Sequence, residues 1–247
     1  RGRLMSQRIL VIRPSRQADQ FIALLEQAGA QICHTPVMTI EPLVDGQEIK
    51  NLILEVDNFD KAICVSGNAA QLTLEWLDRY WPMMPVGIEF FAVGQQTAEI
   101  LAGADITALT PMGRQNSEAL LALPELQDLS DQRVIIFRGC GGREILGDTL
   151  MERGARVDCC ELYRRVINPE QAMLARQQLA QSDCLVAHSG ELLQALGEQV
   201  GEPGAETPVV VPSERVAEIA RELGYKNIIS AENALPESMF AAVEKAL

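Results

Sequence analysis

The chain has 247 residues, of which 47% are hydrophobic and only 4% aromatic, and its formal net charge is −13. This length suits one large domain or two small ones, and the apolar fraction is enough for an aliphatic core. The acidic balance argues against a nucleic-acid partner, and no apolar run approaches the ~20 residues of a membrane helix. No secretory signal is present, so we expect a cytoplasmic protein with reduced cysteines and no membrane partner. An anionic ligand would have to be held by local donors, since the overall charge repels it.

The sequence gives little support for a metal site or for a catalytic nucleophile. His34 and His188 are the two histidines of the sequence, and neither has cysteines or carboxylates at ligand spacing, so we expect no metal. His188 precedes Ser189, but neighbouring residues on a strand point to opposite faces, which disfavours a nucleophile-and-base pair. Cys140 lies in a glycine-rich loop before a helical pattern, where a thiol can be activated, although a bystander role is favoured.

The chain contains an internal duplication. The matching segments are 8–42 with 133–169, 65–68 with 188–191, and 94–100 with 213–219. Arg13 matches Arg138 in the first pair, and all three matches follow in the same order along the chain. The sequence therefore predicts two similar units.

Each unit alternates short apolar runs with helical patterns. The expected strands are 9–12, 31–35, 61–65, 90–93 and 227–230. The first is followed by a helix over 18–28, which Gly29 can end, whereas residues 1–4 are expected to fray and to carry no fold signal. Strand–helix alternation with short buried strands predicts an α/β fold of two similar lobes, each a doubly wound parallel sheet.

Small and polar residues follow these strands, where ligands bind in open α/β sheets. The turns are 13–15, 66–68, 94–97, 138–143, 189–191 and 212–215. Each can aim free backbone N–H groups at an anion, although the same residues also serve as ordinary helix caps. Six such turns on two matching lobes favour a cleft with several anion sites.

The loop 138–143 is close to a nucleotide-binding sequence but departs from it. Gly139 and Gly141 fit the first two glycines of a dinucleotide fingerprint, whereas Glu144 stands in the third position. This disfavours a nucleotide-dependent enzyme. A carboxylate or phosphate cradle flanked by Arg138 and Arg143 fits better.

Four stretches of the chain resemble the uroporphyrinogen-III synthase family of bacterial type. They are Ile12-Arg13-Pro14, Arg138-Gly139-x-Gly141-Gly142-Arg143-Glu144-x-Leu146, Cys160-Glu161-x-Tyr163-Arg164 and Gly94-x-x-Thr97-Ala98. The resemblance covers essentially the whole chain from Gln7 onward. It implies two lobes joined by a two-stranded linker, with the active site in the cleft between them. Lobe one would hold 5–37 and 168–247, lobe two 44–162, and the linker strands 38–43 and 163–167.

The resemblance also implies the activity. Members cyclise hydroxymethylbilane, a linear tetrapyrrole with eight carboxylates, to uroporphyrinogen III. They invert the terminal ring through a spiro intermediate and lose water, without metal or cofactor. This is a lyase (hydro-lyase) reaction of haem and sirohaem biosynthesis. The alternative is a non-catalytic anion or tetrapyrrole sensor on the same two-lobe fold.

The resemblance implies contacts from Ser66, Thr97, Tyr163 and Ser189. We assign catalytic roles to Tyr163 and Thr97. For Tyr163 the reason is that a neutral phenol can donate a proton without repelling carboxylates. The expected substrate-binding residues are Arg13, Ser66, Gly67, Asn68, Gly94, Gln96, Arg138, Gly139, Gly142, Arg143, Ser189, Gly190, Ser213 and Arg215. Val216 departs from a threonine common in the family, and Arg215 beside it offers a charged donor instead. We expect a monomer whose partner is this small-molecule polycarboxylate.

Overall fold

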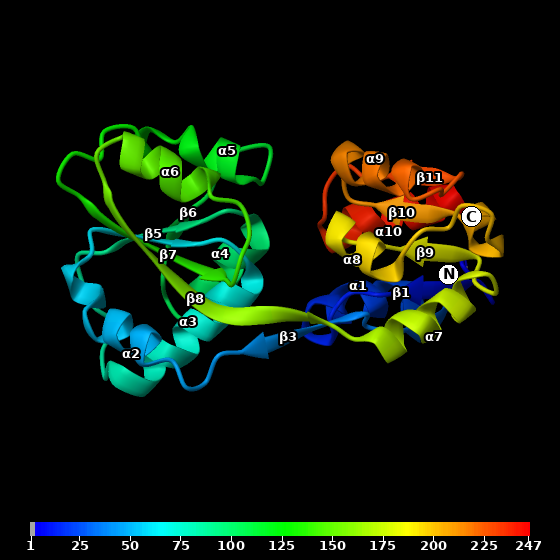
Figure 1. Ribbon diagram of the computed structural model, residues 1–247, viewed down its shortest axis with the longest axis horizontal. Helices are drawn as coiled ribbons and strands as arrows, with labels where there is room; N and C mark the ends of the chain where they lie inside the picture. The colour runs from blue at the N-terminus through cyan, green and yellow to red at the C-terminus, as the bar shows by residue number, and fades with distance from the viewer. Residues whose placement is uncertain (1–2) are drawn as a thin grey trace. The chain divides into compact units, whose positions relative to one another are not determined.

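A computed structural model describes residues 3–247, apart from the side chains of residues 15–17. The chain divides into two compact units, unit 1 with Arg1–Thr39 and Val166–Leu247, and unit 2 with Ile40–Arg165. It passes from one unit to the other within two strands, β3 (Met38–Pro42) and β8 (Arg156–Ile167). Each unit is a sheet with helices on both faces (Figure 1).

Unit 1 contains a five-stranded sheet in the order β11-β10-β9-β1-β2, with all neighbours parallel. Its strands are β1 (Arg8–Val11), β2 (Gln31–His34), β9 (Cys184–Val186), β10 (Val209–Val211) and β11 (Ile228–Ser230). Its helices are α1 (Ser15–Gln27), α7 (Pro169–Leu179), α8 (Gly190–Leu196), α9 (Glu214–Glu222) and α10 (Pro236–Ala246). Along β1, Ile9 and Val11 pack with α1 and α10, whereas Leu10 packs with α7, α8 and α9. Both faces of this strand are therefore buried, which explains its continuous apolar run.

Unit 2 contains a six-stranded sheet in the order β3-β8-β7-β4-β5-β6, parallel from β8 to β6. The remaining strands are β4 (Lys61–Cys64), β5 (Glu89–Ala92), β6 (Ala108–Leu109) and β7 (Arg133–Gly139). The helices are α2 (Gln47–Leu54), α3 (Gly67–Tyr80), α4 (Gln95–Ala102), α5 (Ser117–Leu121) and α6 (Ile145–Glu152). Along β4, Ala62 and Cys64 face the cluster under α2 and α3, whereas Ile63 faces the cluster under α5 and α6.

The two sheets share one topology. The order β2-β1-β9-β10-β11 in unit 1 matches β8-β7-β4-β5-β6 in unit 2, with β3 added at the edge. In each sheet the strand order reverses beside the first strand of the repeat, between β1 and β9 and between β7 and β4. Open α/β sheets bind ligands outside the carboxyl ends of the strands at such a switch point.

The predicted fold class is confirmed, and each predicted strand appears with its bounds shifted by at most one residue. Gly29 has φ +91° and follows the end of α1, as a helix-ending glycine should. The expectation that residues 1–4 carry no fold signal is wrong for Leu4. Its side chain is 1% exposed in the core of unit 1, and its amide donates to the Ala28 carbonyl at 3.2 Å. The expectation for residues 1 and 2 lies outside the described residues.

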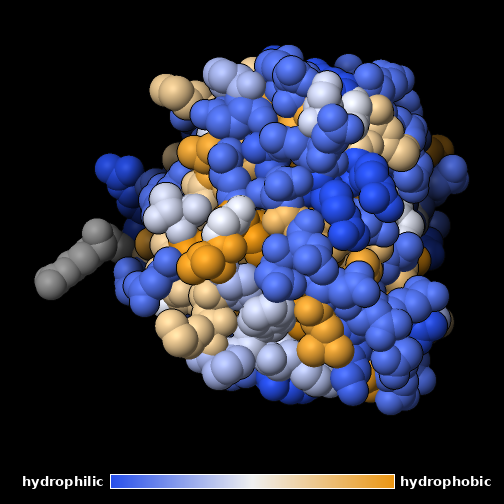
Figure 2. Space-filling model, turned by 90° about the vertical axis from the view of Figure 1, so that its left-hand side faces the viewer, coloured by the Kyte–Doolittle hydropathy of each residue, from blue (hydrophilic) through white to orange (hydrophobic). Residues whose placement is uncertain are grey.

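The surface of unit 2 is mostly polar on the face shown in Figure 2, with hydrophobic areas separated by hydrophilic side chains. Scattered apolar side chains of this kind are normal on a globular protein. Across residues 3–247, the structure has no helix with both the length and the apolar character needed to cross a membrane.

Candidate functional site

The switch point of unit 2 brings together two predicted site residues. Tyr163 lies on β8 and is 1% exposed, and its phenol oxygen is 2.9 Å from Ser66 Oγ. Ser66 follows β4 and is the N-cap of α3, where its Oγ accepts a hydrogen bond from the Ala69 amide at 3.1 Å. Residues 97 positions apart thus meet because parallel strands end at one edge of the sheet.

Gly139 lets the Tyr163 ring lie against the end of β7. A Cβ at this position would be 2.5 Å from Tyr163 Cε2 and 2.7 Å from Cζ, closer than any side chain tolerates. The register between β7 and β8 shifts here, and the Cys140 amide donates to the Tyr163 carbonyl at 2.7 Å. The glycine and the irregularity together fix where the phenol sits.

The two arginines of the glycine loop already have partners within unit 2. Arg138 is 9% exposed, and its guanidinium donates to the Gly141 carbonyl and lies 3.9 Å from a Glu144 carboxylate oxygen. Arg143 pairs with Glu118. These contacts order the loop, so an incoming carboxylate would have to displace them.

The turn before α4 is built from backbone and a neighbouring side chain. Gly94 is the N-cap of α4, and the Gln95 amide next to it donates to Gln115 Oε1 at 3.1 Å. Thr97 is 5% exposed in the first turn of this helix, and Gln96 beside it is partly exposed. The catalytic role of Thr97 stays a prediction, as do the binding roles of Gly94 and Gln96, and those of Gly67 and Asn68 in the first turn of α3.

The serines of the matching turns in unit 1 cap helices. Ser189 Oγ accepts from the Leu192 amide at 3.2 Å, and Ser213 Oγ accepts from the Val216 amide at 3.4 Å. These bonds are what the capping interpretation expects. Gly190 is buried and Arg215 is exposed, and their predicted contacts with a ligand stay predictions.

Arg13 and two histidines gather at the switch point of unit 1. His34 Nε2 donates to the Arg13 carbonyl at 2.7 Å, and burial lowers the pKa of Arg13 to about 10, so the guanidinium stays charged at neutral pH. The His188 ring packs edge-on against Phe21, with ring centroids 5.3 Å apart. Burial first, and then the charge of Arg13, hold the pKa of His188 well below its usual value. His188 is therefore a neutral, packed ring.

The reactive-thiol alternative for Cys140 loses support. Desolvation, and then the hydrogen bond and charge of Glu161, raise the pKa of the Cys140 thiol. The helix after the loop, α6, begins only at Ile145, so the thiol does not lie at its first turn.

Arg165 is a neighbour of Tyr163 that was not among the predicted site residues. Its Nη2 lies 3.4 Å from the phenol oxygen, and its guanidinium carbon lies 5.4 Å from the ring centroid. The two residues are two positions apart on β8, a spacing that places side chains on the same face of a strand. This spacing is the feature of the sequence from which the contact between Arg165 and Tyr163 could have been predicted.

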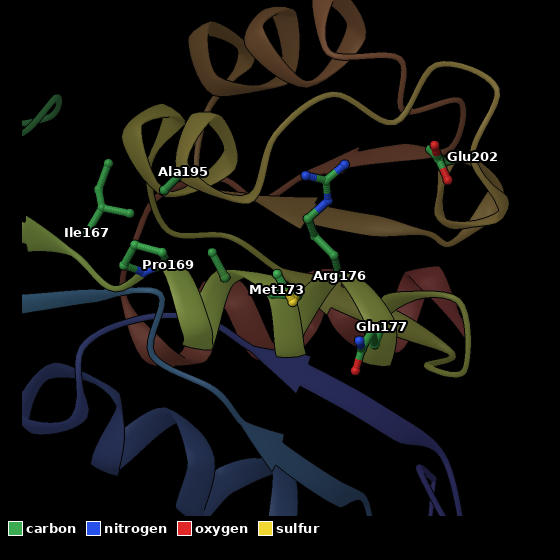
Figure 3. A pocket seen from close by; sticks show the side chains of 8 residues that line it. Ile167, Pro169, Met173, Arg176, Gln177, Ala195 and Glu202 are labelled. Atoms are coloured by element: carbon green, nitrogen blue, oxygen red, sulfur yellow. The ribbon is translucent and has the colours of Figure 1, made fainter.

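A shallow pocket of about 530 Å³ lies elsewhere, in unit 1 beside α7 (Figure 3). Its lining residues are Ile167, Pro169, Ala172, Met173, Arg176, Gln177, Ala195 and Glu202. None of these is a predicted site residue. We place the candidate site at the switch points, because convergent polar groups lie there.

The fold and the candidate site define a duplicated α/β protein with polar turns at both switch points. Comparisons with known proteins identify the family to which this chain is similar. The model of the family described as "Uroporphyrinogen-III synthase HemD" matches residues 19–241. A uroporphyrinogen-III synthase of Escherichia coli (strain K12) is 36% identical, covering 96% of this chain and 99% of its own. One from Salmonella typhimurium is 35% identical, covering 96% and 99%.

Solved structures support the same fold. A mutant uroporphyrinogen III synthase from the extremely thermophilic bacterium Thermus thermophilus superposes with a TM-score of 0.68 at 21% identity, covering 98% of each chain. A uroporphyrinogen-III synthetase from Helicobacter pylori 26695 gives 0.60 at 13% identity, covering 98% of this chain and 100% of its own. The chain belongs to the uroporphyrinogen-III synthase family.

Proposed function

We propose that this chain is a hydro-lyase that cyclises hydroxymethylbilane to uroporphyrinogen III, inverting the terminal ring and releasing water. Family membership over residues 19–241 supports the reaction. The observation that carries the proposal is the Tyr163 phenol, held 2.9 Å from Ser66 Oγ at the switch point of unit 2.

Tyr163 is proposed to supply the proton for loss of water. The C–O bond of the hydroxymethyl group breaks, and its electron pair leaves with the oxygen. That oxygen takes the phenol proton and departs as water, leaving a phenolate and a cationic, pyrrole-stabilised carbon. The proton released when a pyrrole carbon forms the ring-closing bond then returns to the phenolate. Because the phenol is neutral beforehand, it does not repel the carboxylates of the substrate.

Substrate binding is proposed to depend on local donors, because an octacarboxylate meets a chain of net charge −13. Backbone amides at the starts of α3, α4 and α9 are suited to carboxylates, with the positive helix end behind them. The guanidiniums of Arg13 and Arg215 add charge, and those of Arg138 and Arg143 would exchange their present partners for substrate. Thr97 is proposed as a second catalytic-site hydroxyl.

The test is the fate of freshly prepared hydroxymethylbilane. Left alone, it closes to the I isomer, so a catalyst is recognised by rapid formation of the III isomer. A tetrapyrrole sensor would bind the compound and leave the I isomer as product. Binding without any III isomer would therefore overturn the proposed function.

A further inference from the structure

Arg165 is a second polar neighbour of the Tyr163 phenol. The backbone of Gly139 packs against the ring, and Ser66 Oγ meets the phenol oxygen at 2.9 Å. Arg165 adds another polar contact, with Nη2 at 3.4 Å from the same oxygen. Its guanidinium carbon, 5.4 Å from the ring centroid, is within the range of a cation–π interaction.

Arg164, the adjacent residue, points the other way and provides an internal comparison. Its Nη2 pairs with Glu41 Oε1 at 2.8 Å, and both side chains are about half exposed. An exposed pair of this kind contributes little to stability. The two arginines carry the same charge on one strand, and of the two it is Arg165 whose guanidinium contacts the Tyr163 phenol.

The chemistry of the two groups fixes the direction of the contact. A guanidinium can only donate, so the phenol oxygen accepts from Arg165. The phenol keeps its own proton for Ser66 or for a substrate oxygen on another side. When that proton leaves, the electron pair of the O–H bond stays on an oxygen that lies 3.4 Å from the guanidinium of Arg165, an exposed residue. Preorganised charge next to a developing anion is an effective form of transition-state stabilisation.

We propose that Arg165 is a positioning residue for Tyr163: it directs the phenol O–H bond and stabilises the phenolate formed during loss of water. The inference rests on the proposed function and deepens it, since it assigns a role to a residue that acts through the phenol. It predicts that Arg165 matters only while the phenol oxygen is present.

A double-mutant cycle tests that dependence. Arg165→Gln should lower kcat for hydroxymethylbilane by about tenfold with KM within about twofold, and Arg165→Lys should restore part of the loss. Arg164→Gln, the matched control, should stay within about twofold of the parent. In a Tyr163→Phe background, Arg165→Gln should cost little more. An equal loss with and without the phenol hydroxyl, or a change confined to KM, would overturn the proposal.

A second readout is independent of turnover. The chain has three tyrosines, so 3-fluorotyrosine labelling should give three fluorine resonances, and Tyr163→Phe identifies the one of interest. Arg165→Gln should move that resonance, and Arg164→Gln should not. An unmoved resonance would contradict the contact. If the parent chain forms no III isomer, the proposed function and the role of Arg165 in it both fail, while the resonances still decide whether Arg165 holds the phenol.

Discussion

Replacing Tyr163 with phenylalanine removes one oxygen from a buried ring and leaves the rest of the site in place. The lost group is bonded to Ser66 at 2.9 Å and has a longer contact with Arg165 at 3.4 Å, while Ser66 keeps its bond from the Ala69 amide. The net loss of one such hydrogen bond costs about 1 kcal/mol, or a Tm lowered by roughly 2–4 °C for a chain of this size. Turnover should fall by about tenfold or more, because general acids contribute ~10²–10⁴ and water can act partly in their place.

The assay is steady-state turnover of freshly prepared hydroxymethylbilane, with a melting curve on the same samples. Tyr225→Phe is the matched control. Tyr225 is 3% exposed, and within the described part of the chain its hydroxyl has no hydrogen-bond partner. Removing an unsatisfied buried hydroxyl should leave turnover unchanged and the Tm unchanged or higher. Unaltered turnover in Tyr163→Phe would make Tyr163 a packing residue and would contradict its role as the proton donor.

Three further predictions concern the surroundings of the site. Ser66→Ala loses a helix cap and the phenol contact, so it should cost about 0.5–2 kcal/mol by denaturant unfolding. It should also lose more turnover than Asn168→Ala, a control that loses the cap of α7 and is not a predicted site residue. Gly139→Ala forces the Tyr163 ring aside and should lower the free energy of unfolding by about 1–3 kcal/mol, with a large loss of turnover. A Gly139→Ala variant with the Tm and activity of the parent would contradict this packing. The pKa of His188 is depressed in the folded state. Below about pH 6.5 the unfolded chain therefore binds a proton at this histidine that the folded chain does not, and the free energy of unfolding decreases as the pH is lowered, by at most about 1.4 kcal/mol per pH unit. His188→Gln should therefore lose less stability than the parent between pH 7.5 and 5, and parallel curves would contradict this assignment.

The fold was accessible from the sequence because central strands such as β1 and β4 are buried on both faces. A run such as Ile9–Val11 is apolar throughout, since successive side chains enter two different cores. The duplication then predicted two like lobes. The strand order was not predicted, because pairing between distant strands depends on contacts that local patterns do not encode. Leu4 was misjudged for the same reason, since its core partners come from elsewhere in unit 1.

The candidate site was predictable in its residues but not in its contacts. Ser66 and Tyr163 were named separately from their motifs, whereas their meeting depends on the register shift at the end of β7. Arg138 and Arg143 were named as the two arginines that flank an anion cradle in the glycine loop. The structure instead pairs them within unit 2, through Gly141, Glu144 and Glu118. Composition shows that a cation is available, but it does not show which acceptor already holds it.

The most direct test of the proposed activity is the isomer composition of the uroporphyrinogen formed at increasing ratios of chain to hydroxymethylbilane. The products can be oxidised and separated by chromatography after a fixed time. The proposed activity predicts that the III isomer rises with the amount of chain until it is almost the sole product, and that Tyr163→Phe needs about tenfold or more protein to reach the same fraction. Product that remains the I isomer at every ratio would contradict it.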